Sequence, residues 1–170
     1  IGPTSYRMGI ENSFSIQLSN YLKLGTNQSL AMHKILDYIY IIPTYNEDYT
    51  VNKEQSISTY FNSTDIALSP QWISFVELCY SPTPNLIFKM NNKTVSKQYL
   101  DNTSDDSKSI PTYSFINFIA EFDTKIKGFK NLKFNLLLNN ILDTKVSTRG
   151  YTFNTGNSIN STGIKTKGQD

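Results

Sequence analysis

Few side chains in this sequence could do chemistry. It contains one histidine and one cysteine, so it can form neither an internal disulfide nor a zinc knuckle. His33 has no evident partner, because Asp37 would share its side only on a helix. On a strand His33 shares a face with Ala31 and Ile35, and we interpret it as a polar residue facing a lumen or lying near a loop. We expect Cys79 to be a small apolar residue, buried or facing lipid.

Carboxylates offer no stronger site. The pairs Glu47-Asp48 and Asp105-Asp106 fall in predicted loops, where they could contact a cation or substrate but are explained more simply as solvated side chains. No glycine-rich phosphate loop, His/Cys cluster or nucleophile elbow is present. The sequence therefore predicts no enzyme and no catalytic, cofactor or metal site, and it leaves substrate-binding residues unknown. Asn-x-Ser/Thr triplets are what a chain rich in Asn and Ser yields by chance; they begin at Asn27, Asn62, Asn92, Asn102 and Asn160.

The composition indicates β-structure. Aromatic residues make up 13% of the chain, with 11 Tyr and 10 Phe, and the formal net charge is only +2. Disordered chains have few aromatics and high net charge, whereas Tyr, Phe and Thr favour strands. No basic stripe suggests a nucleic-acid partner. No stretch approaches the roughly 20 apolar residues of a membrane helix.

Period-two alternation is the strongest pattern. Between Tyr6 and Leu18, alternate residues are almost wholly apolar, and those between them are polar or small. A helix, with its period of 3.6, would mix the two sets, so this segment is predicted to be a strand. In the segment from Trp72 to Tyr80 the alternation is less clean, because Ile73 and Phe75 share the parity of Glu77. About six strands are predicted, over residues 6–18, 22–33, 72–80, 86–93, 116–123 and 132–139.

The predicted connections alternate between short and long. The short ones lie near 19–21, 81–85 and 127–130, and the long polar ones span 43–69, 101–109 and the residues from 147 onward. The long ones carry Asn, Asp, Ser, Thr and Pro, which favour loops. This order predicts an antiparallel up-and-down meander with every long loop on the same side.

Two architectures fit such strands. A soluble barrel or sandwich would bury the apolar face, whereas a membrane barrel would turn it toward lipid and the polar face toward a lumen. The strands exceed the roughly 5–6 residues usual in soluble sheets and reach the roughly 9–11 that cross a bilayer. Aromatic residues near strand ends also favour the membrane barrel: Tyr6, Tyr21, Trp72, Tyr80 and Tyr113. A soluble β-sandwich or barrel that binds a ligand or glycan remains the alternative.

Several ordered segments resemble TonB-dependent outer-membrane receptors. Residues 131–145 (NLKFNLLLNNILDTK) are similar to that family's penultimate strand and the Asn-Asn turn after it, and 149–153 (RGYTF) to the stretch that often follows. Residues 96–103 (SKQYLDNT) resemble an element that ends a strand and opens an extracellular loop. Further similar segments are 5–11 (SYRMGIE), 64–70 (TDIALSP) and 110–113 (IPTY).

The resemblance implies an outer-membrane barrel of about 22 strands with an N-terminal plug. Such receptors of Gram-negative bacteria import scarce solutes, such as iron chelates, vitamin B12 or glycans, with energy passed on by TonB. Residues 1–153 would supply about six strands facing outer-membrane lipid. The TonB complex would be a partner through an N-terminal part outside this sequence. The solute is unknown. Phe134, Leu136 and Leu138 would face lipid, so that labelling them from the lumen side should fail.

The sequence also departs from the family pattern. Ser96 stands where Gly is frequent, and Val146 where Tyr is common. Residues 154–170 show no alternating final strand that ends in an aromatic residue, so we expect a polar tail or a truncated extracellular loop there. The chain opens with Ile1-Gly2-Pro3, without Met or a signal peptide. These features lead to the expectation of a chain truncated at both ends, or of a degraded gene product.

Overall fold

The computed structural model describes residues 3–126, 128, 131–154 and 162–168, with the backbone alone for 153–154 and 162–168. The described elements are strands and one short 3₁₀ helix, η1 (Asp106–Lys108). No helix in this part of the chain is long and apolar enough to cross a membrane. The strands are β1 (Thr4–Ser19), β2 (Leu22–Tyr45), β3 (Val51–Asp65), β4 (Trp72–Thr83), β5 (Leu86–Val95), β6 (Gln98–Tyr99), β7 (Ser109–Ile110), β8 (Tyr113–Thr124), β9 (Leu132–Leu138), β10 (Ser147–Asn154) and β11 (Thr162–Gly168).

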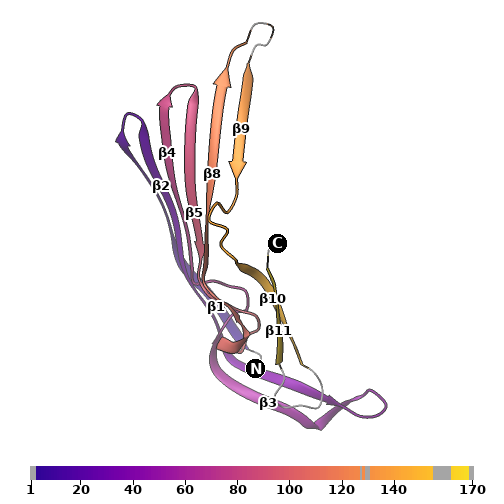
Figure 1. Cartoon of the computed structure of the whole chain (residues 1–170). Coiled ribbons are helices and arrows are strands. Elements are labelled where there is room, and N and C mark those ends of the chain that lie inside the picture. The colour runs from indigo at the N-terminus through magenta and orange to yellow at the C-terminus, as the bar shows by residue number, and fades with distance from the viewer. Residues whose placement is uncertain (1–2, 127, 129–130, 155–161, 169–170) are drawn as a thin grey trace.

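The main sheet is an antiparallel meander. It has seven strands in the order β1-β2-β4-β5-β8-β9, with β3 pairing with β2 beyond the end of β4. The β1–β2, β4–β5 and β8–β9 connections lie at one end of the sheet, and β3 and the β10–β11 hairpin at the other (Figure 1). The all-β antiparallel class predicted from the sequence is confirmed. Among the described residues the sheet is open and does not close into a barrel.

The prediction of a loop over 43–69 is wrong for most of that range. β2 continues to Tyr45, and β3 returns along it with a register that joins Ile42 to Ile57 and Tyr38 to Phe61. The run from Ile39 to Ile42 is apolar on both parities, whereas β3 is mostly polar. Alternation is therefore weak here, although β-branched and aromatic residues still favour strands.

The end of the chain also contains more strand than expected. β10 and β11 pair in a separate two-stranded sheet, in which Gly150 is joined to Thr166. Part of the stretch expected as a polar tail or truncated loop is thus a hairpin strand, which does not pair with the main sheet. The remaining residues of that stretch, 155–161 and 169–170, lie outside the described residues.

One face of the main sheet is mostly apolar. The register places one apolar side chain on each of six neighbouring strands in a single row: Ile16, Leu24, Leu78, Met90, Phe118 and Leu138. Phe134 and Leu136 lie on the same face and are 55% and 51% exposed. Among described residues, buried hydrophobic side chains are few (Val95, Ile110 and Val146). The sheet is therefore a single layer with an uncovered apolar face.

The opposite face carries charges. Glu121 on β8 pairs with Lys89 (Nζ–Oε1 2.7 Å) and with Lys133 (Nζ–Oε2 3.5 Å). Cys79 also lies on this face, between Lys23 and Lys89 in the register, because its neighbours Leu78 and Tyr80 occupy the apolar face. The thiol is half-buried on the polar face, so the expectation of a buried Cys79 is wrong.

Candidate binding site at the loop end of the sheet

The pairing of strands along β2 is interrupted between β3 and β4. The connection over 66–71 stays attached to β2 at both ends, since Ile66 donates its N–H to the His33 carbonyl (3.1 Å) and Ala31 donates to the Gln71 carbonyl (2.8 Å). Between these points the chain leaves the sheet and meets the loop that follows β5. Leu68 there donates its N–H to the Tyr99 carbonyl (2.8 Å). This arrangement opens a cavity at the loop end.

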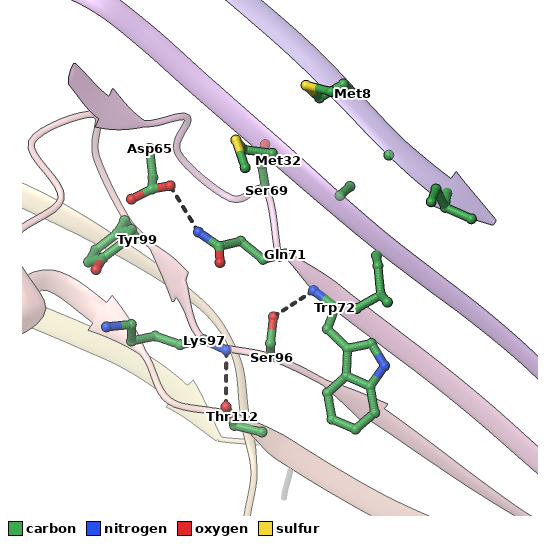
Figure 2. A pocket seen from close by; sticks show the side chains of 14 residues that line it. Met8, Met32, Asp65, Ser69, Gln71, Trp72, Ser96, Lys97, Tyr99 and Thr112 are labelled. Carbon is green, nitrogen blue, oxygen red and sulfur yellow. Dashed lines mark hydrogen bonds between the residues drawn. The ribbon is translucent and has the colours of Figure 1, made fainter.

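The cavity has a volume of about 770 Å³ and two unlike walls. One wall is apolar and comes from β1 and β2: Met8, Ile10, Leu30 and Met32. The other comes from 65–72 and from the loop after β5, with Gln71, Trp72, Ser96, Lys97 and Tyr99 among its residues. Figure 2 shows the hydrogen bonds that hold this second wall: Gln71 Nε2 to Asp65 Oδ1 (3.1 Å), Trp72 N to Ser96 Oγ (3.0 Å) and Lys97 N to Thr112 Oγ1 (3.1 Å).

The loop between β5 and β8 is fastened to the base of the β2–β3 hairpin. Asp65 donates its N–H to Ser104 Oγ (2.7 Å), and its carboxylate accepts from Ser104 Oγ (3.2 Å) and pairs with Lys34 (2.9 Å). Ala67 donates its N–H to Asn102 Oδ1 (2.7 Å). Because these bonds join 65–67 to 102–104, the cavity depends on contacts between segments far apart in the sequence.

A buried lysine, Lys108, lies inside the loop between β5 and β8. Lys108 is 8% exposed, and its ammonium lies 3.4 Å from Asp101 Oδ2, 3.9 Å from Asp105 Oδ2 and 5.5 Å from the centre of the Tyr40 ring. Hydrogen bonds from the hydroxyl and N–H of Ser107 hold the pKa of Asp105 below its usual value, although burial opposes them. Burial, together with the charge of Asp101, raises the pKa of Tyr38.

The residues singled out from the sequence are dispersed. Asp106 is in this loop, where its carboxylate accepts from Lys97 Nζ (2.6 Å) and from the Tyr99 hydroxyl (3.1 Å). Asp48 lies at the β2–β3 turn and accepts from the N–H and hydroxyl of Thr50, which is a turn-forming role. Its neighbour Glu47 lies in the same turn.

His33 and Asp37 show no sign of a joint site. His33 is half-buried opposite Arg7, and its Nδ1 is buried without a hydrogen-bond partner. Asp37 accepts a hydrogen bond from the Tyr60 hydroxyl and has a left-handed backbone (φ 54°). Within the part of the chain that the structure describes, no group of three or more His, Cys, Asp or Glu side chains could hold a metal ion.

The cavity residues were not predicted from the sequence. Lys97 and Tyr99 fall in the segment 96–103 that resembles an outer-membrane receptor, but Gln71 and Met32 carry no motif. Apart from the receptor-like segments, the available signal was the strand end at Trp72, where an aromatic residue follows a polar connection. The 66–71 connection contacts a loop about thirty residues further along the chain. A contact between such distant segments leaves no local pattern in the sequence.

Comparison with known proteins adds one likeness. No protein-family model matches this sequence, and a search of curated proteins finds no match. Among solved structures, the fold is similar to that of the siderophore receptor PiuA from Acinetobacter baumannii, with a TM-score of 0.57 and 16% sequence identity. The match covers 88% of this chain and 19% of that receptor, so the chain spans about a fifth of the receptor's length. At this identity the likeness concerns the fold alone.

Proposed function

We propose that this chain forms part of the wall of an outer-membrane β-barrel, in a receptor of the TonB-dependent type that takes up a scarce solute. The observation that carries the proposal is the exposed apolar face, which runs across six neighbouring strands and lies opposite a charged face. Lipid outside and water inside are the surroundings that these two faces require. The resemblance to the siderophore receptor, and the receptor-like segments of the sequence, support the same assignment.

Exposure of the apolar face to water would be energetically unfavourable. Full burial of a Leu, Met or Phe side chain is worth about 1.5–3 kcal/mol relative to leaving it exposed. Leu136, Phe14 and Leu30 are 51%, 53% and 58% exposed on this face. A contiguous apolar surface of this kind marks an interaction site, and a bilayer would cover all of it at once.

The polar face would line the path of the solute. Lys23, Glu77, Lys89, Lys93 and Glu121 bring both signs of charge to it. In a water-filled lumen these groups remain hydrated, whereas in hydrocarbon each would be costly. The apolar wall of the loop-end cavity lies on the face proposed to meet lipid, so the solute path is assigned to the polar face. Because the similar structure is a siderophore receptor, a ferric siderophore is the first solute to test.

The alternative is a soluble β-sandwich or barrel that binds a ligand or glycan. A sandwich buries its apolar face against a second sheet about 10 Å away. Within the described residues, the other sheets are the two-stranded pairs β6–β7 and β10–β11. Neither has the width to cover the apolar face of the seven-stranded sheet, and this favours the membrane wall.

The test is the behaviour of the chain with and without a membrane mimic. We expect circular dichroism to show folded β-structure in detergent micelles or phosphatidylcholine vesicles, and sedimentation to show aggregates in plain buffer. Replacing Leu78 and Met90 on the apolar face by Asn should reduce partition into vesicles. Replacing Glu77 and Asn91 on the polar face by Gln should not. A folded monomer in detergent-free buffer would overturn the membrane assignment in favour of the soluble one.

A further inference from the structure

The apolar wall of the loop-end cavity is a separate patch on the apolar face. It is formed by four side chains of β1 and β2 that are between 46% and 74% exposed: Met8, Ile10, Leu30 and Met32. A row of polar side chains lies between this wall and the larger apolar surface nearer the hairpin turns: Asn12, Gln28 and Ser74. The wall therefore needs a cover of its own, beyond the one that the rest of the apolar face requires.

The opposite wall of the cavity presents hydrogen-bond donors. Ser96 Oγ accepts the N–H of Trp72 (3.0 Å), and Thr112 Oγ1 accepts the N–H of Lys97 (3.1 Å). Among the hydrogen bonds of the described residues neither hydroxyl donates, so both O–H groups are available to a ligand. Lys97 adds an ammonium with three N–H donors, one of which bonds to Asp106 (2.6 Å). This wall suits a ligand that is rich in acceptor oxygens.

The carboxylates near this wall leave room for an anionic group. Asp65 already pairs with Lys34 (2.9 Å) and accepts a hydrogen bond from Gln71 (3.1 Å). Asp106 pairs with Lys97, but both side chains are exposed, and an exposed ion pair contributes little to stability. A phosphate can therefore join or replace Asp106 at the Lys97 ammonium with little loss.

The two walls face each other across a space of ligand size. Figure 2 shows the methionines on one side of the cavity and the donors on the other: Met8 and Met32 against Ser96, Lys97 and Thr112. The volume of about 770 Å³ falls within the roughly 300–1,000 Å³ of small-ligand sites. A ligand that fills this space is apolar on one side and carries acceptor oxygens on the other. A phospholipid has both, in its acyl chain and in its phosphate and ester groups.

The position of the cavity favours a lipid over a transported solute. Ile10 and Leu30 lie on the same side of β1 and β2 as Ile16 and Leu24, because they are an even number of positions away along each strand. This is the side that the proposed function turns toward the bilayer, whereas the solute path is assigned to the opposite face. A lipid of the surrounding membrane therefore reaches the cavity directly.

We propose that the loop-end cavity binds one phospholipid molecule. The acyl chain lies on the β1–β2 wall, the phosphate meets the Lys97 ammonium, and the hydroxyls of Ser96 and Thr112 donate to phosphate or ester oxygens. A lipid held in this way joins the β1–β2 hairpin to the loop after β5, because each supplies one wall of the cavity. This inference rests on the proposed function.

The intrinsic fluorescence of Trp72 provides the test, since this residue lines the cavity and the sequence contains one tryptophan. The full chain is folded in maltoside micelles and titrated with a lysophosphatidylglycerol whose acyl chain carries bromine, which quenches tryptophan. We expect the quenching to saturate at a low fraction of bromolipid, and unbrominated lysophosphatidylglycerol to reverse it. Inorganic phosphate should not reverse it, because it lacks the acyl chain.

Two pairs of variants locate the site. Leu30→Gln in the apolar wall and Lys97→Gln in the donor wall should each raise the bromolipid fraction at half-saturation about fivefold. The matched controls lie outside the cavity: Leu78→Gln on the apolar face, and Lys145→Gln, which removes an exposed ammonium paired with Asp143. Both controls should leave the half-saturation point unchanged. Circular dichroism of each variant verifies its β-structure.

The outcomes separate the lipid site from the membrane assignment. Quenching that rises in proportion to bromolipid, or that Leu30→Gln and Lys97→Gln leave unchanged, would show ordinary contact with bulk lipid and overturn the inference alone. Reversal by inorganic phosphate would also overturn it. In a Trp72→Phe background, Leu78→Trp probes the apolar face outside the cavity. If that tryptophan responds to no bromolipid in the folded chain, the proposed function itself fails.

Discussion

At the scale of single residues, two lysines of the loop between β5 and β8 have different surroundings. The ammonium of Lys108 is enclosed by Asp101, Asp105 and the Tyr40 ring. Lys97, by contrast, is exposed, and the hydrogen bond to Asp106 raises its pKa. Removing one member of a buried ion pair leaves the other charge without compensation, whereas exposed pairs contribute little. The enclosed lysine should therefore hold the loop in place.

Replacing Lys108 by Met should release the loop from the β2–β3 hairpin. Asp101 would be left buried beside Asp105 without its counter-charge, at a cost of about 3 kcal/mol. Hydrogen–deuterium exchange of residues 99–110 should become markedly faster. The matched variant Lys97→Met removes an exposed pair and should leave the same amides as protected as before. Equal protection in both variants would show that Lys108 does not fasten the loop.

At the scale of elements, the β1–β2 hairpin contains two glycines with opposite surroundings. A Cβ at Gly9 would lie 2.6 Å from the Leu30 carbonyl oxygen and 2.9 Å from the Cβ of Ala31. At Gly25 a Cβ would meet nothing within 4 Å. An added methyl group therefore has no room at Gly9, close to the cavity, but has room at Gly25.

Gly9→Ala should weaken the hairpin, whereas Gly25→Ala should strengthen it. The first places a methyl group where backbone and side chain must shift, at about 1–3 kcal/mol. The second restricts the unfolded chain without a clash and should add about 0.5–1 kcal/mol. Urea midpoints in detergent micelles measure both. A similar midpoint for the two variants would mean that β1 and β2 adjust freely around Gly9.

At the scale of the whole molecule, the chain is a curved sheet one layer thick rather than a body around a core (Figure 1). Its stability has to come from strand pairing and from whatever covers the apolar face. Two adjacent residues of β9 lie on opposite faces of the sheet. Leu136 is aligned with Ala120 on the apolar face, and Asn135 with Glu121 on the polar face. These neighbours allow the two faces to be probed at the same height.

In a Cys79→Ser background, Asn135→Cys should react with a membrane-impermeant maleimide in vesicles. Leu136→Cys should stay unlabelled until detergent is added, because lipid would cover that face. Both cysteines should react at comparable rates in the chain unfolded in urea. Rapid labelling of Leu136→Cys in intact vesicles would place the apolar face in water and contradict the membrane wall.

Much of the fold could be predicted from the sequence. All six expected strands are present, and residues such as Ile16, Leu24 and Leu78 lie on the face that their parity indicates. The extension of β2 and the strand β3 were missed, because Ile39 to Ile42 are apolar on both parities. The candidate carboxylates were predicted as loop residues, but the pairing of Asp106 with Lys97 was not, since it depends on how the loop folds back.

What the sequence determined by itself is local: where strands run, which side of each is apolar, and which connections are short. These follow from the alternation of side chains along a pleated strand, which needs no knowledge of partners. The tertiary structure decided which strands pair and in which register. It thereby placed Gln28, Ser74 and Thr94 side by side and brought 65–72 against 96–112 to form the cavity. Both arise from hydrogen bonds between residues distant in the chain. Period-two alternation predicts the face on which a side chain lies, but it does not predict which strand pairs with which.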